Sequence, residues 1–193
     1  MESPKIYQLK KEAYLYPYLN YYPDIAENVF LAPGVKIIGN VEIGKDSSVW
    51  YNSVIRGDVH YIKIGEGTNI QDCSMLHVTN GKYPLNIGNN VTIGHAVVLH
   101  GCTLNDLCFI GIGAVVLDGA IIESNAMVAA GALVKQDFVV PAGKLVAGVP
   151  AKVIRDLTKK EIEEFEASAI RYREYSIITQ NSLDDLNNKI VTK

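Results

Sequence analysis

An aliphatic residue returns at every sixth position through the middle of this chain. The series, interrupted by two insertions and by one step of five residues from Ile93 to Val98, is Ile37, Ile43, Val49, Ile55, Ile64, Ile70, Leu76, Ile87, Ile93, Val98, Leu104, Ile110, Val116, Ile122, Val128 and Val134. A period of six is not helical, and a hexad is too short for a hairpin. The pattern therefore predicts a parallel β-helix whose coils stack on one another. Scattered strands of a β-sandwich would not hold one register over so many hexads.

A second inward position lies four residues after each aliphatic, and its side chain is small or β-branched almost throughout. These residues are Val41, Ser47, Ser53, Val59, Thr68, Ser74, Val91, Val97, Cys102, Cys108, Ala114, Ala120, Ala126 and Ala132. Glycine often follows the aliphatic, as in Ile43-Gly44, where a tight turn leaves little room for a side chain. The repeat resembles the hexapeptide-repeat left-handed β-helix, an all-β solenoid in which three hexads form one triangular coil. We expect it to occupy residues 30–151.

Two insertions break the register, at residues 61–63 and 82–86. Loops that interrupt a solenoid often carry function. After residue 151 the segment from Thr158 to Glu161 has the form of a capping box, which predicts the start of a helix within residues 152–180. Ile162, Phe165, Ala169 and Tyr172 give this helix an apolar stripe that would pack along the β-helix as far as about Ile178. Residues 181–193 are expected to form a polar tail.

The segment before the repeat, residues 1–29, is rich in tyrosine. The tyrosines are Tyr7, Tyr14, Tyr16, Tyr18, Tyr21 and Tyr22. We expect an extended cap over the open first coil, because a solenoid end must be covered. The alternative is a partner-binding arm, since tyrosines supply a large contact area at low entropic cost.

Composition excludes several classes of protein. The chain has 193 residues, with 18 Lys+Arg against 21 Asp+Glu and a net charge of −3, so one domain is expected and no basic footprint for nucleic acid is present. No apolar stretch approaches the roughly 18 residues that span a bilayer, which argues against a membrane protein. The three cysteines, Cys73, Cys102 and Cys108, are too few for a disulfide framework, and no secretion signal follows Met1. A reducing cytoplasm is the expected location.

Three of the four histidines acquire a common interpretation from the register. If the hexads at positions 37, 43 and 49 begin faces A, B and C, then His77 and His100 lie on face A in successive coils, about 4.8 Å apart. His95 lies on the preceding face, C, and cannot reach the other two through the filled interior. It could reach them from a neighbouring subunit, if three subunits pack around a threefold axis. Three imidazoles with one open position match a catalytic zinc site.

Polar residues gather on the same two faces. Arg56 and Asp58 lie on face A, and Gln71 and Asp72 lie on face C. A solvated face would explain each of them alone. Their concentration on the two faces that carry the histidines favours a buried polar interface.

The motifs that hold these residues resemble a known family. They are Arg56-Gly57-Asp58, Asn69-Ile70-Gln71-Asp72, Leu76-His77-Val78, Gly94-His95, Leu99-His100-Gly101-Cys102 and the terminal Gly148-Val149-Pro150-Ala151-Lys152. The combination resembles the gamma-class carbonic anhydrases over about residues 29–172. The hexads and the terminal segment alone would equally suit hexapeptide-repeat acyltransferases.

The resemblance implies a homotrimer with a metal site at each subunit interface. His77, His95 and His100 would hold Zn²⁺, with Fe²⁺ as the other metal considered. Water activated by the metal, with a pKa near 7, would supply hydroxide to attack CO₂ and form bicarbonate.

The resemblance also assigns roles to other residues. Gln71 would orient the hydroxide, Asn69 would lie close by, and Tyr172 would reach toward the site from the C-terminal helix.

Arg56 matches an interface arginine of the family. It would pair with Asp58 and with Asp72, a task for which a bidentate guanidinium is better suited than a lysine.

The chain departs from the family at two positions. The best-characterised members of the family carry one glutamate directly after the aspartate of the Arg-x-Asp motif and another in an acidic loop three residues after the first metal histidine, and both act in proton transfer. Here these positions are Val59 and Asn80. Proton export needs an ionisable relay, so turnover is expected to be weak. His60 is ionisable but adjacent to Val59 on a strand, so it should point the other way and act as a surface histidine.

Two other functions fit the same fold. An acyltransferase using acetyl-CoA would need one histidine as a general base, and would leave three converging histidines unexplained. A non-catalytic, metal-binding scaffold subunit is favoured by the missing glutamates and the tyrosine-rich N-terminus. Because function resides in the site rather than in the fold, the site must separate these alternatives.

Overall fold

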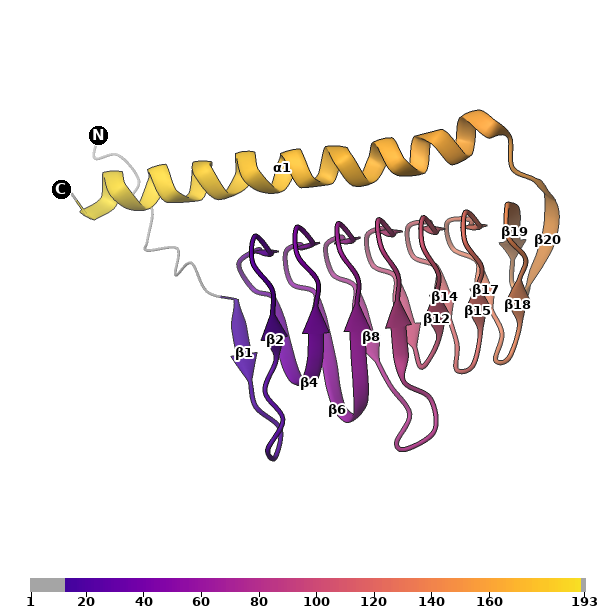
Figure 1. The fold of residues 1–193 in the computed structure, drawn as a ribbon, viewed down its shortest axis with the longest axis horizontal. Coiled ribbons are helices and arrows are strands. Elements are labelled where there is room, and N and C mark those ends of the chain that lie inside the picture. The colour runs from indigo at the N-terminus through magenta and orange to yellow at the C-terminus, as the bar shows by residue number, and fades with distance from the viewer. Residues whose placement is uncertain (1–12, 192–193) are drawn as a thin grey trace, which may run out of the picture.

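The computed structural model describes residues 13–191 and shows a β-solenoid with one helix running back along it (Figure 1). Each coil contributes short strands to three faces, as the hexads predict. The strands of faces A and B form one hydrogen-bonded sheet, because β4 and β6 continue around the corner between these faces. The strands of face C form a second sheet. Strands of successive coils pair in parallel within each face, so the predicted β-solenoid is confirmed.

The strands can be grouped by face. Face A contains β1 (Tyr14–Tyr16), the first parts of β4 (Lys36–Ile43) and β6 (Val54–Ile64), β8 (Met75–His77), β11 (Val98–His100), β14 (Val115–Val116) and β17 (Leu133–Val134). Face B contains β2 (Asp24–Ile25), the second parts of β4 and β6, β9 (Leu85–Ile87), β12 (Thr103–Leu104), β15 (Ile121–Ile122) and β18 (Val139–Val140). Face C contains β3 (Phe30–Leu31), β5 (Ser48–Val49), β7 (Asn69–Ile70), β10 (Thr92–Ile93), β13 (Phe109–Ile110), β16 (Met127–Val128) and β19 (Lys144–Gly148), with β20 (Ala151–Asp156) antiparallel to β19 at the end.

The hexad aliphatics fill the core, with one exception. Ile37, Ile93 and Ile110 are fully buried. At the position assigned to Val98, however, the buried residue is Leu99, which pairs in register with Leu76 and Val116, while Val98 is only half-buried. The assignment of Val98 to the core was therefore wrong, and the step of five residues falls after Leu99. Two adjacent aliphatics both satisfy a hydrophobic pattern, so only the strand register distinguishes them.

The insertions lie at the corner between faces A and B. Val59 was expected to fill the small inward position there, but Ile62 occupies it, in register with Val41 and Leu85. The first insertion is absorbed into the long strand β6. The second forms a loop closed by a bridge between Thr79 and Tyr83.

The tyrosine-rich segment forms a coil of its own from Tyr14 onward. Strands β1 and β2 pair in parallel with β4, which extends faces A and B by one strand each. The described part of residues 1–29 thus lies against the coil that follows it. Its role as a cap stays a prediction. Tyr7 lies outside the described residues. Tyr21 and Tyr22 are exposed, and a partner for this surface stays a prediction.

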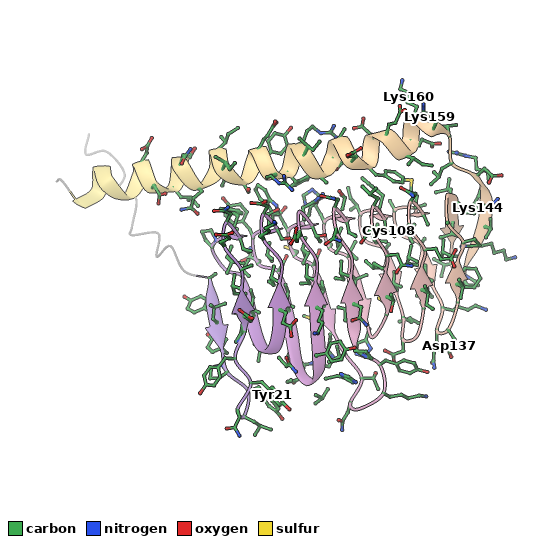
Figure 2. All side chains as sticks on the ribbon, in the orientation of Figure 1. Tyr21, Cys108, Asp137, Lys144, Lys159 and Lys160 are labelled. Atoms are coloured by element: carbon green, nitrogen blue, oxygen red, sulfur yellow. The ribbon has the colours of Figure 1, made fainter. Side chains whose placement is uncertain are left out.

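Helix α1 (Lys159–Val191) packs on face C, where it contacts β3, β5, β7 and β10 (Figures 1 and 2). Phe165 and Ala169 of the predicted stripe are buried and Tyr172 is half-buried. The helix continues well past Ile178, so the predicted tail from residue 181 is wrong in its boundary. Leu183 prolongs the apolar stripe onto the core. Within the described residues, no helix has the length and apolar character needed to cross a membrane.

The capping box at the start of α1 is present. The Glu161 carboxylate accepts from the backbone N–H of Thr158 at 2.8 Å, and the Glu161 N–H donates to the Thr158 hydroxyl at 3.3 Å. The bond from Arg155 and the bonds from Thr158 together hold the pKa of Glu161 at about 2, below its usual 4.5. A carboxyl whose pKa is lower in the folded than in the unfolded protein stabilises the fold at every pH above its unfolded-state pKa. For Glu161 this stabilisation is lost as the pH falls from 4.5 toward 2.

Thr158→Ala is therefore expected to lower the free energy of unfolding by about 1 kcal/mol, because it removes the N-cap hydroxyl. The pH dependence of the melting temperature between neutral and acidic pH should also become shallower. Thermal unfolding followed by circular dichroism measures both effects. Ser182→Ala, within the helix, is the control and should leave both near wild type. Equal effects of the two changes would contradict the capping role.

Candidate metal centre

Two of the predicted metal histidines face each other on face A. His77 ends β8 and His100 ends β11, and the two residues are register partners in neighbouring coils. Their ring centroids are 5.0 Å apart, and His77 Nδ1 lies 3.1 Å from His100 Nε2. Both rings are half-buried. The expectation that they share one face in successive coils is confirmed.

Each of these rings has a carboxylate on its other nitrogen. His77 Nε2 lies 3.1 Å from Asp58 Oδ1, and His100 Nδ1 lies 2.6 Å from Asp118 Oδ1. A carboxylate can only accept, so both of these nitrogens carry hydrogen. The two nitrogens that face each other are then both acceptors in the neutral rings.

Two facing lone pairs are unfavourable unless a cation lies between them. Two imidazole nitrogens on one tetrahedral zinc, each about 2.0–2.1 Å from the metal, are about 3.3 Å apart, close to the 3.1 Å observed. Carboxylates on the distal nitrogens of metal-binding histidines are also the usual arrangement. The donor set of His77 and His100 therefore fits a zinc ion.

Burial and neighbouring groups together shift the pKa values of both His77 and Asp58 downward. Burial lowers the pKa of His77, and the nearby Arg56 charge acts in the same direction, against the hydrogen bond to Asp58. Burial acts to raise the pKa of Asp58, but the bonds from Arg56 and His77 outweigh it, and the carboxyl pKa lies below its usual value. Arg56 donates to Asp58, as predicted. Its other predicted partner, Asp72, pairs within the chain with His95 instead.

His95 lies in the turn after β10, apart from the other two histidines. His95 Nδ1 is 2.7 Å from Asp72 Oδ2. Both residues line a cavity of about 280 Å³ together with Trp50 and Tyr172. Tyr172 packs edge-on against Trp50 with ring centroids 5.6 Å apart, and burial raises its pKa. In the part of the chain that the structure describes, no group of three His, Cys, Asp or Glu side chains is arranged to hold a metal ion, so a three-histidine centre requires a second copy.

Asn69 and Gln71 form a separate buried pair. Gln71 Nε2 donates to Asn69 Oδ1 at 3.2 Å. Asn69 Nδ2 donates to the Thr92 hydroxyl at 2.9 Å, which bonds in turn to Ser168 of α1 at 3.1 Å. Asn69 thus connects face C to the helix. The described contacts of a single chain do not bring Asn69 or Gln71 to the histidines.

The two positions without glutamate, Val59 and Asn80, lie in different surroundings. Val59 packs against the core, and Asn80 is exposed in the Thr79–Tyr83 loop. His60 uses Nδ1 to accept the backbone N–H of Tyr61 at 2.9 Å, which gives it a local structural contact.

Asp118, Thr79 and Trp50 were missed in the sequence. Asp118 follows Val116 on face A, one coil after His100. The same face assignment that singled out Asp58 could have found it.

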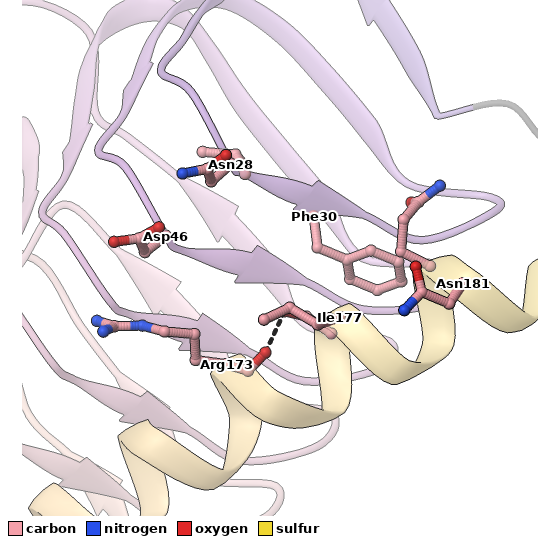
Figure 3. A pocket seen from close by; sticks show the side chains of 9 residues that line it. Asn28, Phe30, Asp46, Arg173, Ile177 and Asn181 are labelled. Atoms are coloured by element: carbon pink, nitrogen blue, oxygen red, sulfur yellow. Dashed lines mark hydrogen bonds between the residues drawn. The ribbon is translucent and has the colours of Figure 1, made fainter.

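Another pocket lies between α1 and the first coils, with a volume of about 450 Å³. Arg173, Ile177 and Asn181 of α1 line it opposite Phe30 and Asp46 (Figure 3). It contains none of the predicted site residues.

Comparison with known proteins points to one family. The chain is 50% identical over 148 residues to a probable carbonic anhydrase of Methanocaldococcus jannaschii, and the aligned segment covers 77% of this chain and 92% of that protein. It is 49% identical over 160 residues to a carbonic anhydrase of Geobacillus kaustophilus, and the aligned segment covers 83% of this chain and 87% of that protein. It is 47% identical over 155 residues to gamma carbonic anhydrase 1, mitochondrial, of Arabidopsis thaliana, with 78% of this chain but only 56% of that protein covered.

A family model and two solved structures place the chain among hexapeptide-repeat proteins. Residues 22–57 match the family described as bacterial transferase hexapeptide (six repeats). A hexapeptide transferase family protein from Anaplasma phagocytophilum superposes with a TM-score of 0.81 at 44% identity, covering 84% of this chain and 96% of that one. A putative acetyltransferase from Bacillus cereus superposes with a TM-score of 0.84 at 41% identity, covering 86% of this chain and 96% of that one. The chain belongs to the gamma carbonic anhydrase family of hexapeptide-repeat proteins.

Proposed function

We propose that the protein is a zinc-dependent enzyme that hydrates CO₂ to bicarbonate at sites shared between the subunits of a cytoplasmic homotrimer. The observation that carries this proposal is the pair of acceptor nitrogens of His77 and His100, 3.1 Å apart, each ring held by a carboxylate. The names of its relatives point in the same direction. Imidazole ligands also suit Fe²⁺, which is the alternative metal.

The third ligand in this proposal is His95 of a neighbouring subunit. In this proposal the hydrogen of the neutral His95 ring is on Nδ1, which lies 2.7 Å from Asp72 Oδ2, so that Nε2 presents its lone pair to the metal. The side chain of His95 is 45% exposed in the single chain and can therefore meet another subunit.

The residues around the metal have separate tasks. A bound zinc ion supplies a water whose pKa is lowered to about 7, which makes hydroxide available to CO₂ near neutral pH. Asp58 orients the ring of His77, and Arg56 keeps Asp58 ionised. Gln71 orients the attacking oxygen across the interface, and Tyr172 closes the cavity beside His95.

Proton export is the weak step in this proposal. Val59 packs against the core and Asn80 is exposed in a loop, so neither position offers a carboxylate relay. Protons must then leave to the buffer. We expect the hydration rate at saturating CO₂ to rise with the concentration of a small buffer such as imidazole, measured by stopped flow on zinc-loaded protein. A rate independent of buffer would contradict this limitation.

Gln71→Ala is expected to lower the hydration rate roughly 10- to 100-fold at every buffer concentration, because it acts on the nucleophile rather than on the proton. The matched control is Gln180→Ala on the exposed surface of α1, which should leave the rate unchanged. If added buffer restored the Gln71→Ala rate, the residue would belong to the proton path instead.

Acyl transfer is the second candidate, favoured by the name of the Bacillus cereus structure. An assay with acetyl-CoA and amine acceptors separates the two enzymes. Fully zinc-loaded protein without hydration at any buffer concentration, and without acyl transfer, would instead identify a metal-binding scaffold.

A further inference from the structure

The Asp118 carboxylate joins the metal centre to the loop of the second insertion. One of its oxygens, Oδ1, lies 2.6 Å from His100 Nδ1. The other, Oδ2, accepts the Thr79 hydroxyl at 2.9 Å. Because each oxygen has its own partner, the carboxylate is fixed in rotation as well as in position.

Thr79 is itself held by the loop. Its backbone N–H donates to the Tyr83 carbonyl at 3.1 Å, and the Tyr83 N–H donates back to the Thr79 carbonyl at 3.3 Å. The Gly81 N–H reaches the Val59 carbonyl of β6 at 3.4 Å. The loop is therefore closed on itself and attached to the neighbouring coil.

Tyr83 anchors this loop across the following coils. A Cβ on Gly101 would lie 2.6 Å from the Tyr83 Cβ, and a Cβ on Gly119 would lie 2.9 Å from Tyr83 Cε1, so both positions must remain glycine for the tyrosine to lie there. The Tyr83 hydroxyl lies 3.4 Å from Asp137 Oδ1 and accepts from Gln136 Nε2 at 3.3 Å. Asp137 lies on the side of the solenoid away from α1 (Figure 2).

We propose that Asp118, fixed by Thr79 in the loop that Tyr83 anchors, is a positioning residue that sets the tautomer of His100 and aims its Nε2 lone pair at the metal. This inference rests on the proposed function for the identity of the ligand. Asp118 can only accept, so it requires the hydrogen of His100 on Nδ1 and leaves Nε2 unprotonated. Without this constraint the hydrogen could occupy Nε2, the nitrogen that faces His77, and compete with the metal.

The first test reads the tautomer directly in metal-free, full-length protein labelled with ¹⁵N-histidine. The His100 ring should carry its hydrogen on Nδ1 in the wild type. Asp118→Asn introduces an amide that can donate to Nδ1, so the fraction with hydrogen on Nε2 should rise. Thr79→Val should give a smaller change in the same direction, and Thr79→Ser should restore the wild-type spectrum.

Asp106→Asn is the matched control. Asp106 occupies the same kind of corner: its Oδ1 would lie 2.3 Å from a Cβ added to Gly88, just as Asp118 Oδ1 would lie 2.3 Å from a Cβ added to Gly101. Asp106 Oδ1 accepts the backbone N–H of Asn89 at 2.7 Å rather than a histidine nitrogen. It should leave the tautomer of His100 unchanged. Circular dichroism checks that every variant is folded. A His100 spectrum unchanged by Asp118→Asn would overturn the proposal.

The second test measures zinc affinity by competition with a chelator. Asp118→Asn is expected to bind zinc about 10- to 100-fold more weakly, Thr79→Val more weakly than wild type, and the double variant no more weakly than Asp118→Asn alone. Additive losses would mean that Thr79 does not act through Asp118. Wild-type protein that binds no zinc would refute the proposed function while the tautomer experiment still decides on Asp118. Normal zinc affinity in Asp118→Asn would refute the positioning role and leave the proposed function intact.

Discussion

His100→Ala is expected to abolish zinc binding while leaving the solenoid folded. His100 Nε2 faces His77 Nδ1 at 3.1 Å. Without His100 the proposed site keeps only two of the three protein ligands that a catalytic zinc site uses. The fold depends on inward residues such as Leu99, which is fully buried, whereas the His100 ring points outward. Metal analysis of the purified protein and circular dichroism measure the two outcomes.

His95→Ala should lose the metal equally, although His95 lies apart from the pair in a single chain. This is expected only if the site is shared between subunits. His60→Ala is the control, because the hydrogen bond and the ring contact of His60 are with Tyr61 and not with the other histidines. Stoichiometric zinc in His95→Ala would show that His95 is not a ligand. If light scattering showed a monomer, and metal analysis showed that it retains one tightly bound zinc per chain, the shared site would be contradicted.

Ile122→Asp is expected to unfold the protein or to destabilise it by about 3–5 kcal/mol, since it places an unpaired charge in a packed interior. Ile122 is fully buried in β15, which lies between β12 and β18 on face B. A charge there has no partner and displaces the stacked aliphatics.

The neighbouring residue supplies a matched control. Ile121, on the same strand, points outward and is 37% exposed. Ile121→Asp should change the free energy of unfolding by less than about 1 kcal/mol. Urea unfolding of the two variants, followed by circular dichroism, compares them directly. Similar losses would show that the inward and outward positions of the hexad had been interchanged.

The hexad period was sufficient to predict the faces of the solenoid. An inward side chain must recur once on each side of each coil. Counting in steps of six from the first inward residue therefore assigns every later residue to a face. His77 and His100 were found in this way, and the register confirms them. The count was ambiguous where two aliphatics are adjacent, at Val98 and Leu99, since hydrophobicity cannot distinguish them, and it failed at the first insertion, where Ile62 takes the inward position expected for Val59. There the hydrogen-bond register decides which one points inward.

The surroundings of the histidines depended on the tertiary structure. The sequence contained Asp118, but its contact with His100 arises because a corner of one coil lies over a glycine of the coil before it. The loop that brings Thr79 to Asp118 has no period, so its path follows from packing of Tyr83 over Gly101 and Gly119.

The sequence by itself determined the repeat, the capping box at Thr158 and the face of each histidine, because these follow from local spacing. Only the tertiary structure decided that Leu99 is the inward residue, that Ile62 replaces Val59 in the core, and that α1 extends to Val191. These outcomes depend on which surfaces meet between coils and between the solenoid and the helix. Contacts between residues distant in the chain are set by packing and register, and a local pattern does not contain them.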